Sequence, residues 1–214
     1  ITLARQGAFL TLVDQNAEWV ERTATMVREA GGECQVVLGN VTDAADCARI
    51  VAETGKKFGR VDILVNNVGI SGPRGNAVEV DPDEWDAAMQ VNVKSMMLMA
   101  KYVIPEMRKL GAGAIVNIAS IMGLSGGGLY PNISYQTSKG GVVNMTRALA
   151  VEWAPLQIRV NAVAPTWTRT PFIGELENSP ALMERIRSVT PMKRLAEADE
   201  VAAAVLFLAS PAAS

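Results

Sequence analysis

Short apolar runs alternate with helical patterns along the whole chain, and this alternation limits the fold more than any other feature. Apolar, β-branched runs occur at 9–13, 34–38, 61–65, 114–118 and 158–163. Helical patterns lie between and after them, at 16–30, 43–58, 81–109, 134–153 and 199–209. Such strands, separated by helices, are typical of a parallel sheet covered on both faces. With right-handed crossovers, the sequence predicts a doubly wound α/β fold in three layers.

Composition excludes several classes of function. The chain contains no histidine, which excludes a Ser-His-Asp centre and any histidine metal site. Its two cysteines, Cys34 and Cys47, have no metal-ligand spacing, so no metal is predicted. A net charge of −2 indicates no nucleic-acid partner. Without a long apolar stretch or a signal peptide, we predict a cytoplasmic protein with no membrane partner.

Polar residues follow the predicted strands at the points where the strands end. Asp14, Asn66–Gly69, Ser120 and Pro165–Thr166 all occupy such positions. In a doubly wound fold the carboxyl ends of the strands form the ligand crevice. These residues are therefore expected to gather at one rim of the sheet.

Tyr135 and Lys139 are four residues apart in a predicted helix, so both project from one face. A lysine ammonium beside a tyrosine favours the phenolate and lowers its pKa, which makes the phenol a usable acid and base. By itself the pair is also typical of an ordinary exposed helix surface. Ser120 and Asn92 change this interpretation, because the fold places both near the same helix.

These residues resemble the short-chain dehydrogenase/reductase family over essentially the whole chain. The matching stretches occur in the family's order: Asn66–Gly69, Asn92, Ser120, Tyr135–Lys139, Arg159–Pro165 and Leu206–Pro211. The resemblance implies a Rossmann-like fold and a nicotinamide-dependent oxidoreductase acting on a secondary alcohol or ketone. It also implies the catalytic roles. Tyr135 exchanges the proton, Lys139 lowers the tyrosine pKa and holds the nicotinamide ribose, Ser120 positions the substrate oxygen, and Asn92 holds a water.

The cofactor predicted from Asp14 is NAD rather than NADP. A carboxylate at the end of this strand can accept hydrogen bonds from the adenosine ribose, and its charge repels a 2′-phosphate. A turn or helix-capping aspartate is the alternative. The resemblance places the remaining cofactor contacts at Asn40, Val41, Asn67, Val68, Gly69, Tyr135, Lys139, Pro165, Thr168 and Thr170. Asn40, Val68, Thr166 and Thr168 depart from the residues that are usual in the family.

The family's glycine-rich phosphate loop has no counterpart in this sequence, which opens with Ile1-Thr-Leu-Ala-Arg-Gln-Gly7. Residues 1–214 are therefore expected to form a single dinucleotide-binding and catalytic domain that is truncated at both ends and lacks its first and last strands. We expect the natural protein to extend before Ile1 and after Ser214.

The substrate pocket is expected between Met122–Asn132 and the segment from Trp167 to Met192. The apolar residues of these segments alternatively pack against the last helix. The resemblance at Tyr135–Lys139 and Glu152–Ala154 is closest to sugar and polyol dehydrogenases, with a 3-oxoacyl thioester reductase as the alternative. A catalytically silent NAD-binding or scaffold protein is the alternative from another class. Family members usually assemble through helices such as 81–109 and 134–153, which implies a homotetramer or homodimer.

Overall fold

The computed structural model describes residues 1–126, 128–174 and 178–214. The strands are β1 (Leu10–Asp14), β2 (Cys34–Leu38), β3 (Ile63–Asn66), β4 (Gly113–Ile118), β5 (Ile158–Val163), β6 (Thr168–Arg169) and β7 (Ala196–Glu197). The α-helices are α1 (Thr2–Arg5), α2 (Ala17–Glu29), α3 (Ala44–Phe58), α4 (Pro82–Met89), α5 (Ser95–Leu110), α6 (Ile133–Trp153), α8 (Pro180–Val189) and α9 (Ala198–Ala209). Each strand and helix predicted from the sequence is present, with ends displaced by a few residues.

All strand pairs are parallel. Strand β1 pairs with β2, and Asp14 is opposite Leu38 at the carboxyl end of this pair. A second sheet has the order β3-β4-β5, with Asn66 opposite Asn117. Within the described residues no ladder joins β1 to β3. The predicted α/β class is confirmed, and in the described part of the chain β1-β2 and β3-β4-β5 form separate ladders.

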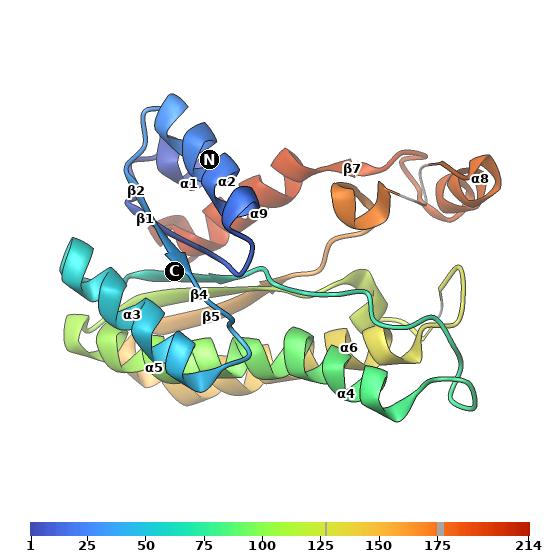
Figure 1. The fold of residues 1–214 in the computed structure, drawn as a ribbon, viewed down its shortest axis with the longest axis horizontal. Helices are drawn as coiled ribbons and strands as arrows, with labels where there is room; N and C mark the ends of the chain where they lie inside the picture. Colours follow the sequence, from blue (N-terminus) through green and yellow to red (C-terminus); the bar gives the residue numbers. More distant parts are fainter. Residues whose placement is uncertain (127, 175–177) are drawn as a thin grey trace.

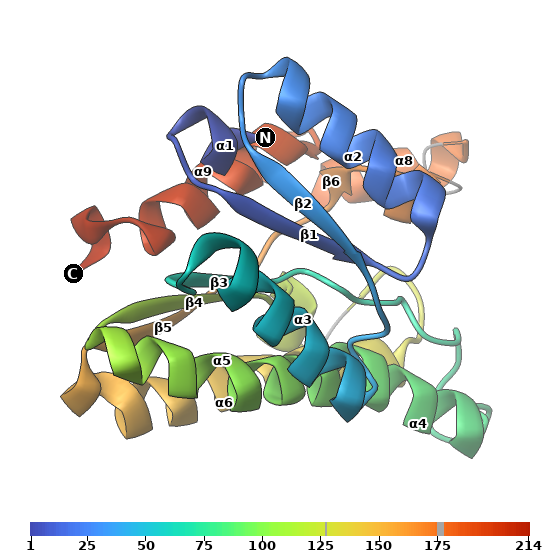
Figure 2. The same cartoon turned by 60° about the vertical axis from the view of Figure 1, so that its left-hand side comes forward.

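Helices cover both faces of the β3-β4-β5 sheet. Figure 1 shows α3, α4, α5 and α6 below the sheet and α1, α2 and α9 above it. Turning the molecule shows β1 and β2 crossing above the second sheet under α2 (Figure 2). The largest apolar cluster includes the fully buried side chains Met107, Ile115 and Ile158, from α5, β4 and β5. This cluster fixes the lower helices against the strands that carry the polar carboxyl-end residues.

The helix predicted at 81–109 contains a five-residue π-helical segment, η1 (Gln90–Lys94), between α4 and α5. Asp81 begins α4, where its carboxylate accepts hydrogen bonds from the backbone N–H groups of Asp83 and Glu84, and Pro82 occupies the first helical position. Single π-helical turns commonly occur at functional sites. The segment contains Asn92, which is fully buried.

Arg159 of β5 fixes the end of α9. Its guanidinium donates to the backbone carbonyls of Leu208 at 2.7 Å and Ser210 at 3.0 Å, among others. A cation at a helix C-terminus also complements the negative end of the helix dipole.

No helix in the described part of the chain has the length and apolar character needed to cross a membrane.

Candidate active site

Tyr135 and Lys139 lie in the first turns of α6. The helix begins at Asn132, whose side-chain oxygen accepts a hydrogen bond from the Tyr135 backbone N–H at 3.2 Å. The Lys139 Nζ is 5.7 Å from the centroid of the Tyr135 ring. Lys139 is only 3% exposed, so the pair is not an ordinary exposed helix surface. The predicted juxtaposition of phenol and amine is therefore present in the structure.

The Lys139 amine is enclosed by backbone at the end of β4. Its Nζ donates to the Ile118 carbonyl at 2.7 Å. Burial lowers the pKa of Lys139 to about 8. A Cβ at Gly69 would lie 3.4 Å from this Nζ and 3.3 Å from Asn92 Oδ1, so a larger residue there would press on both side chains. Gly69 thus leaves the free space beside Lys139.

Ser120 lies beside the Tyr135 hydroxyl. Burial raises the pKa of Tyr135, the hydrogen bond from Ser120 lowers it, and the nearby Tyr130 phenol raises it, with a net upward effect. The expectation that Lys139 lowers this pKa stays a prediction. The amine of Lys139, with a pKa of about 8, is largely protonated at neutral pH. Ser120 is the residue that favours the phenolate here.

Asn92 joins the segment after β3 to α6. Its Oδ1 accepts from the Ile70 backbone N–H at 2.8 Å, while its Nδ2 donates to the Ile70 carbonyl and to Ser138 Oγ, both at 2.9 Å. Both amide hydrogens of the side chain therefore have protein partners. The water-holding role of Asn92 stays a prediction, and the contacts show a positioning role.

A buried polar chain lies behind these residues, and sequence analysis did not single it out. Asn66 Nδ2 donates to Asn117 Oδ1, and Asn117 Nδ2 donates to Thr146 Oγ1, both at 2.9 Å. The three side chains come from β3, β4 and α6, and all are buried. Polar residues at the ends of apolar strands are the sequence signal that points to this chain. It fixes the strand ends relative to α6.

Asp14 retains an unpaired carboxylate oxygen at the carboxyl end of β1. Its Oδ1 accepts from the Asn16 backbone N–H at 2.9 Å, and Oδ2 has no hydrogen-bond partner among the described residues. Asn16, rather than Asp14, caps α2 by accepting from the Trp19 N–H. Of the alternatives raised for Asp14, the turn contact is present and the helix cap is not.

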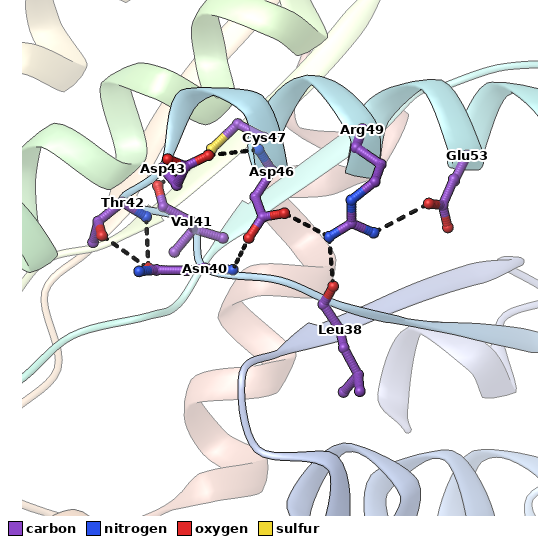
Figure 3. A network of polar contacts seen from close by, with 9 residues as sticks. All are labelled: Leu38, Asn40, Val41, Thr42, Asp43, Asp46, Cys47, Arg49 and Glu53. Atoms are coloured by element: carbon purple, nitrogen blue, oxygen red, sulfur yellow. Dashed lines mark hydrogen bonds and ion pairs between the residues drawn. The ribbon is translucent and has the colours of Figure 1, made fainter.

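The turn after β2 is fixed by its own side chains (Figure 3). Asn40 Oδ1 accepts from the backbone N–H of Thr42 at 3.0 Å and from its hydroxyl at 2.8 Å, which leaves the Asn40 amide nitrogen for a ligand. The hydrogen bond from the Asn40 backbone N–H has the largest effect on the Asp46 carboxyl and lowers its pKa. The hydrogen bond from the Arg49 side chain lowers this pKa further. The half-buried Val41 follows Asn40 in this turn.

The other predicted cofactor residues follow β3 and β5. Asn67 and Val68 are exposed directly after β3. The Pro165 carbonyl accepts from the Ile121 N–H at 3.1 Å, which places the end of β5 beside the Ser120 turn. Thr168 Oγ1 donates to the Thr166 carbonyl at 2.9 Å, and Thr170 Oγ1 contacts the Thr168 carbonyl at 3.4 Å. Both hydroxyls are therefore directed to local backbone.

Aromatic residues from the two segments predicted to bound the pocket lie near Tyr135. The ring of Phe172 lies 6.2 Å from that of Tyr135, and the Tyr130 phenol is close enough to act on its pKa. Tyr130 and Trp167 pack against a cluster of Ile173, Met183, Ile186 and Leu195. The apolar residues of the two segments thus pack on one another. Gly127 and residues 175–177 lie outside the described residues.

Comparison with known proteins finds similarity to dehydrogenases and reductases. A family model described as enoyl-(acyl carrier protein) reductase matches residues 1–214. Galactitol 2-dehydrogenase (L-tagatose-forming) of Cereibacter sphaeroides is 40% identical over 99% of this chain and 82% of its own length. A 3-oxoacyl-[acyl-carrier-protein] reductase of Thermotoga maritima is 35% identical over 100% and 85%. The structure of NAD+-bound xylitol dehydrogenase superposes with a TM-score of 0.94 at 28% identity, over 99% of this chain and 86% of that one.

Proposed function

The chain belongs to the short-chain dehydrogenase/reductase family, and on this premise we propose that residues 1–214 form one dinucleotide-binding and catalytic domain. The enzyme oxidises a secondary alcohol, or reduces the corresponding ketone, with a sugar or polyol-like substrate. The observation that carries the proposal is the convergence of Ser120, Tyr135 and Lys139 at the end of β4 and the start of α6. A cytoplasmic location and a homotetramer remain predictions.

The residues of the chain supply proton transfer and orientation. The single hydroxyl proton of Ser120 forms a hydrogen bond either to the Tyr135 hydroxyl or to the substrate oxygen. Ser120 therefore holds these two oxygens next to each other. Tyr135 takes the proton from an alcohol or gives it to a developing alkoxide. The Lys139 amine lies 5.7 Å from the centroid of the Tyr135 ring. Asn92 hydrogen-bonds to Ile70 and so holds the segment after β3 against α6. A bound nicotinamide supplies the hydride chemistry.

The residues present fit a nicotinamide dinucleotide at two places. Gly69 leaves space directly beside the Lys139 amine, where ribose hydroxyls would be held. The unpaired Oδ2 of Asp14 is available to adenosine ribose hydroxyls. Gln15 next to it brings no positive charge for a 2′-phosphate. These features support NAD as the cofactor.

Replacing Asp14 tests the cofactor proposal. In Asp14→Ala the ratio of kcat/KM for NAD to kcat/KM for NADP should fall at least about tenfold, because the ribose acceptor and the charge that repels phosphate both disappear. Steady-state assays with each cofactor measure this ratio. Asp62→Ala, at an aspartate directly before β3 that pairs with Arg60, is the matched control and should keep the wild-type ratio. An unchanged ratio in Asp14→Ala would contradict the assignment.

A substrate panel tests the reaction itself. Nicotinamide absorbance is followed with polyols, sugars and 3-oxoacyl thioesters, using NAD(H) and NADP(H) in parallel. We expect turnover of polyhydroxy compounds. Similarity to the Thermotoga maritima reductase supports the second candidate, a 3-oxoacyl thioester reductase, and exclusive reduction of thioesters would favour it. Cofactor binding without turnover of any compound would favour the silent-scaffold alternative.

A further inference from the structure

Arg74 is a cation that the proposed reaction does not use. Its guanidinium carbon lies 4.5 Å from the centroid of the Tyr130 ring, a cation–π distance. No ion pair or hydrogen bond to Arg74 occurs in the ranges 1–126, 128–174 and 178–214. Stacking holds the planar group in one place and leaves its five N–H donors free. This is the state expected of an arginine that awaits an anionic partner.

Backbone hydrogen bonds fix the Arg74 segment to the start of the catalytic helix. The Gly75 N–H donates to the Pro131 carbonyl at 3.1 Å, and the Ile133 N–H donates to the Gly75 carbonyl at 3.4 Å. Asn132 adds a contact from its Nδ2 to the Ser71 carbonyl at 3.1 Å. The position of Arg74 relative to α6 is therefore set by the same residues that position Tyr135.

Tyr130 connects Arg74 to the surroundings of the Tyr135 hydroxyl. One face of the Tyr130 ring receives the guanidinium, and the ring also packs against the apolar cluster of Ile173, Met183, Ile186 and Leu195. The Tyr130 phenol is close enough to Tyr135 to raise the pKa of Tyr135 through space. A molecule whose reacting carbon is at Tyr135 and that extends past Tyr130 would therefore reach Arg74.

Several acidic side chains lie in the same stretch of sequence as Arg74. Glu79 accepts from the Asn76 N–H at 3.3 Å, and Asp81 accepts from two N–H groups at the start of α4. Glu84 lines a surface hollow together with Pro73. Arg74 is the only Lys or Arg between Arg60 and Lys94 in the sequence, so it is the one cation of this stretch.

We propose that Arg74 binds a carboxylate of the substrate, remote from the reacting carbon, so that the enzyme acts on hydroxy acids or oxo acids such as sugar acids in preference to neutral polyols. The proposal rests on the function proposed above and narrows its substrate class. A guanidinium pairs with a carboxylate through two parallel N–H···O bonds, which also fixes orientation. A carboxamide has the same shape and no charge, so acid and amide pairs isolate this interaction.

The test compares D-gluconate with D-gluconamide, and levulinate with levulinamide, on the full chain. Binding is measured by titration calorimetry and kcat/KM by nicotinamide absorbance. For at least one pair we expect wild type to bind the acid at least about tenfold more tightly than the amide. Arg74→Gln should abolish this preference and Arg74→Lys should retain part of it, because lysine keeps the charge and loses the planar pair of donors. Arg22→Gln, at an exposed arginine of α2, is the matched control.

The outcomes separate this inference from the proposed function. Equal or undetectable binding of acid and amide by wild type overturns the carboxylate proposal, as does a preference that survives Arg74→Gln. Turnover of neutral alcohols with no preference for acids would leave the hydride-transfer function standing and this inference wrong. An acid that binds through Arg74 without being oxidised or reduced would support the inference and contradict the proposed reaction.

Discussion

Tyr135→Phe should lower kcat by at least about a thousandfold, within the range that general acid–base catalysis supplies. The substitution removes one oxygen atom and keeps the ring that packs 6.2 Å from Phe172. Lys139 and Ser120 lose a neighbour but keep their own contacts, at Ile118 and Met122. The loss should therefore fall on turnover, measured by nicotinamide absorbance, and leave the structure intact.

Cofactor affinity distinguishes this result from a folding defect. The dissociation constant for NAD, measured by quenching of tryptophan fluorescence, should change by less than about tenfold, because one hydrogen bond at most is lost to the cofactor. Tyr102→Phe on α5 removes a hydroxyl elsewhere and should keep full activity. Wild-type turnover in Tyr135→Phe would sink the proton-transfer role, whatever the cofactor affinity.

Much of the fold could be predicted because the sequence carries its periodicity locally. The strand at 114–118 and the helix at 134–153 are present as Gly113–Ile118 and Ile133–Trp153. The π-helical segment at Gln90–Lys94 was not predictable, since it depends on burying Asn92 against Ile70 and Ser138. Packing between distant segments selects that geometry over a continuous α-helix.

The grouping of Ser120, Tyr135 and Lys139 could be predicted for a different reason, namely that their spacing and strand-end positions follow from the fold class. The surroundings of Tyr135 could not. Tyr130 and Phe172 meet the catalytic ring through loop conformations that no short pattern encodes. Arg74 stacks on Tyr130 across a large separation in sequence. These contacts are long-range, and we propose that they determine substrate choice.

The proposed electrostatic role of Lys139 depends on the charge of its amine. A lysine beside a tyrosine lowers the phenol pKa only while the lysine holds its proton. Burial is a property of the folded chain and lowers the pKa of Lys139 to about 8. The enclosure that brings Lys139 to the site thus narrows the pH range over which its amine is charged.

Lys139→Met should increase stability while removing activity. A folded-state pKa of about 8, against 10.5 for an ordinary lysine, means that keeping Lys139 charged in the folded protein costs about 3 kcal/mol near neutral pH. Methionine fills similar space without a charge but gives up the hydrogen bond to Ile118, worth about 1 kcal/mol. At pH 7 the variant should therefore unfold with a free energy about 2 kcal/mol higher than wild type, and its turnover should fall at least about a hundredfold.

The pH dependence gives the sharper test, because its sign follows from the direction of the shift. Below pH 8 both folded and unfolded Lys139 hold the proton, and the full penalty is present. Between pH 8 and 10.5 the folded protein binds fewer protons than the unfolded chain, so wild-type stability rises relative to Lys139→Met. Urea unfolding at intervals across this window should show the advantage of the variant shrinking and then reversing as the hydrogen bond to Ile118 comes to dominate. Lys56→Met, at an exposed lysine of α3, should show no such window, and a constant difference in Lys139→Met would mean that the amine is not desolvated at the active site.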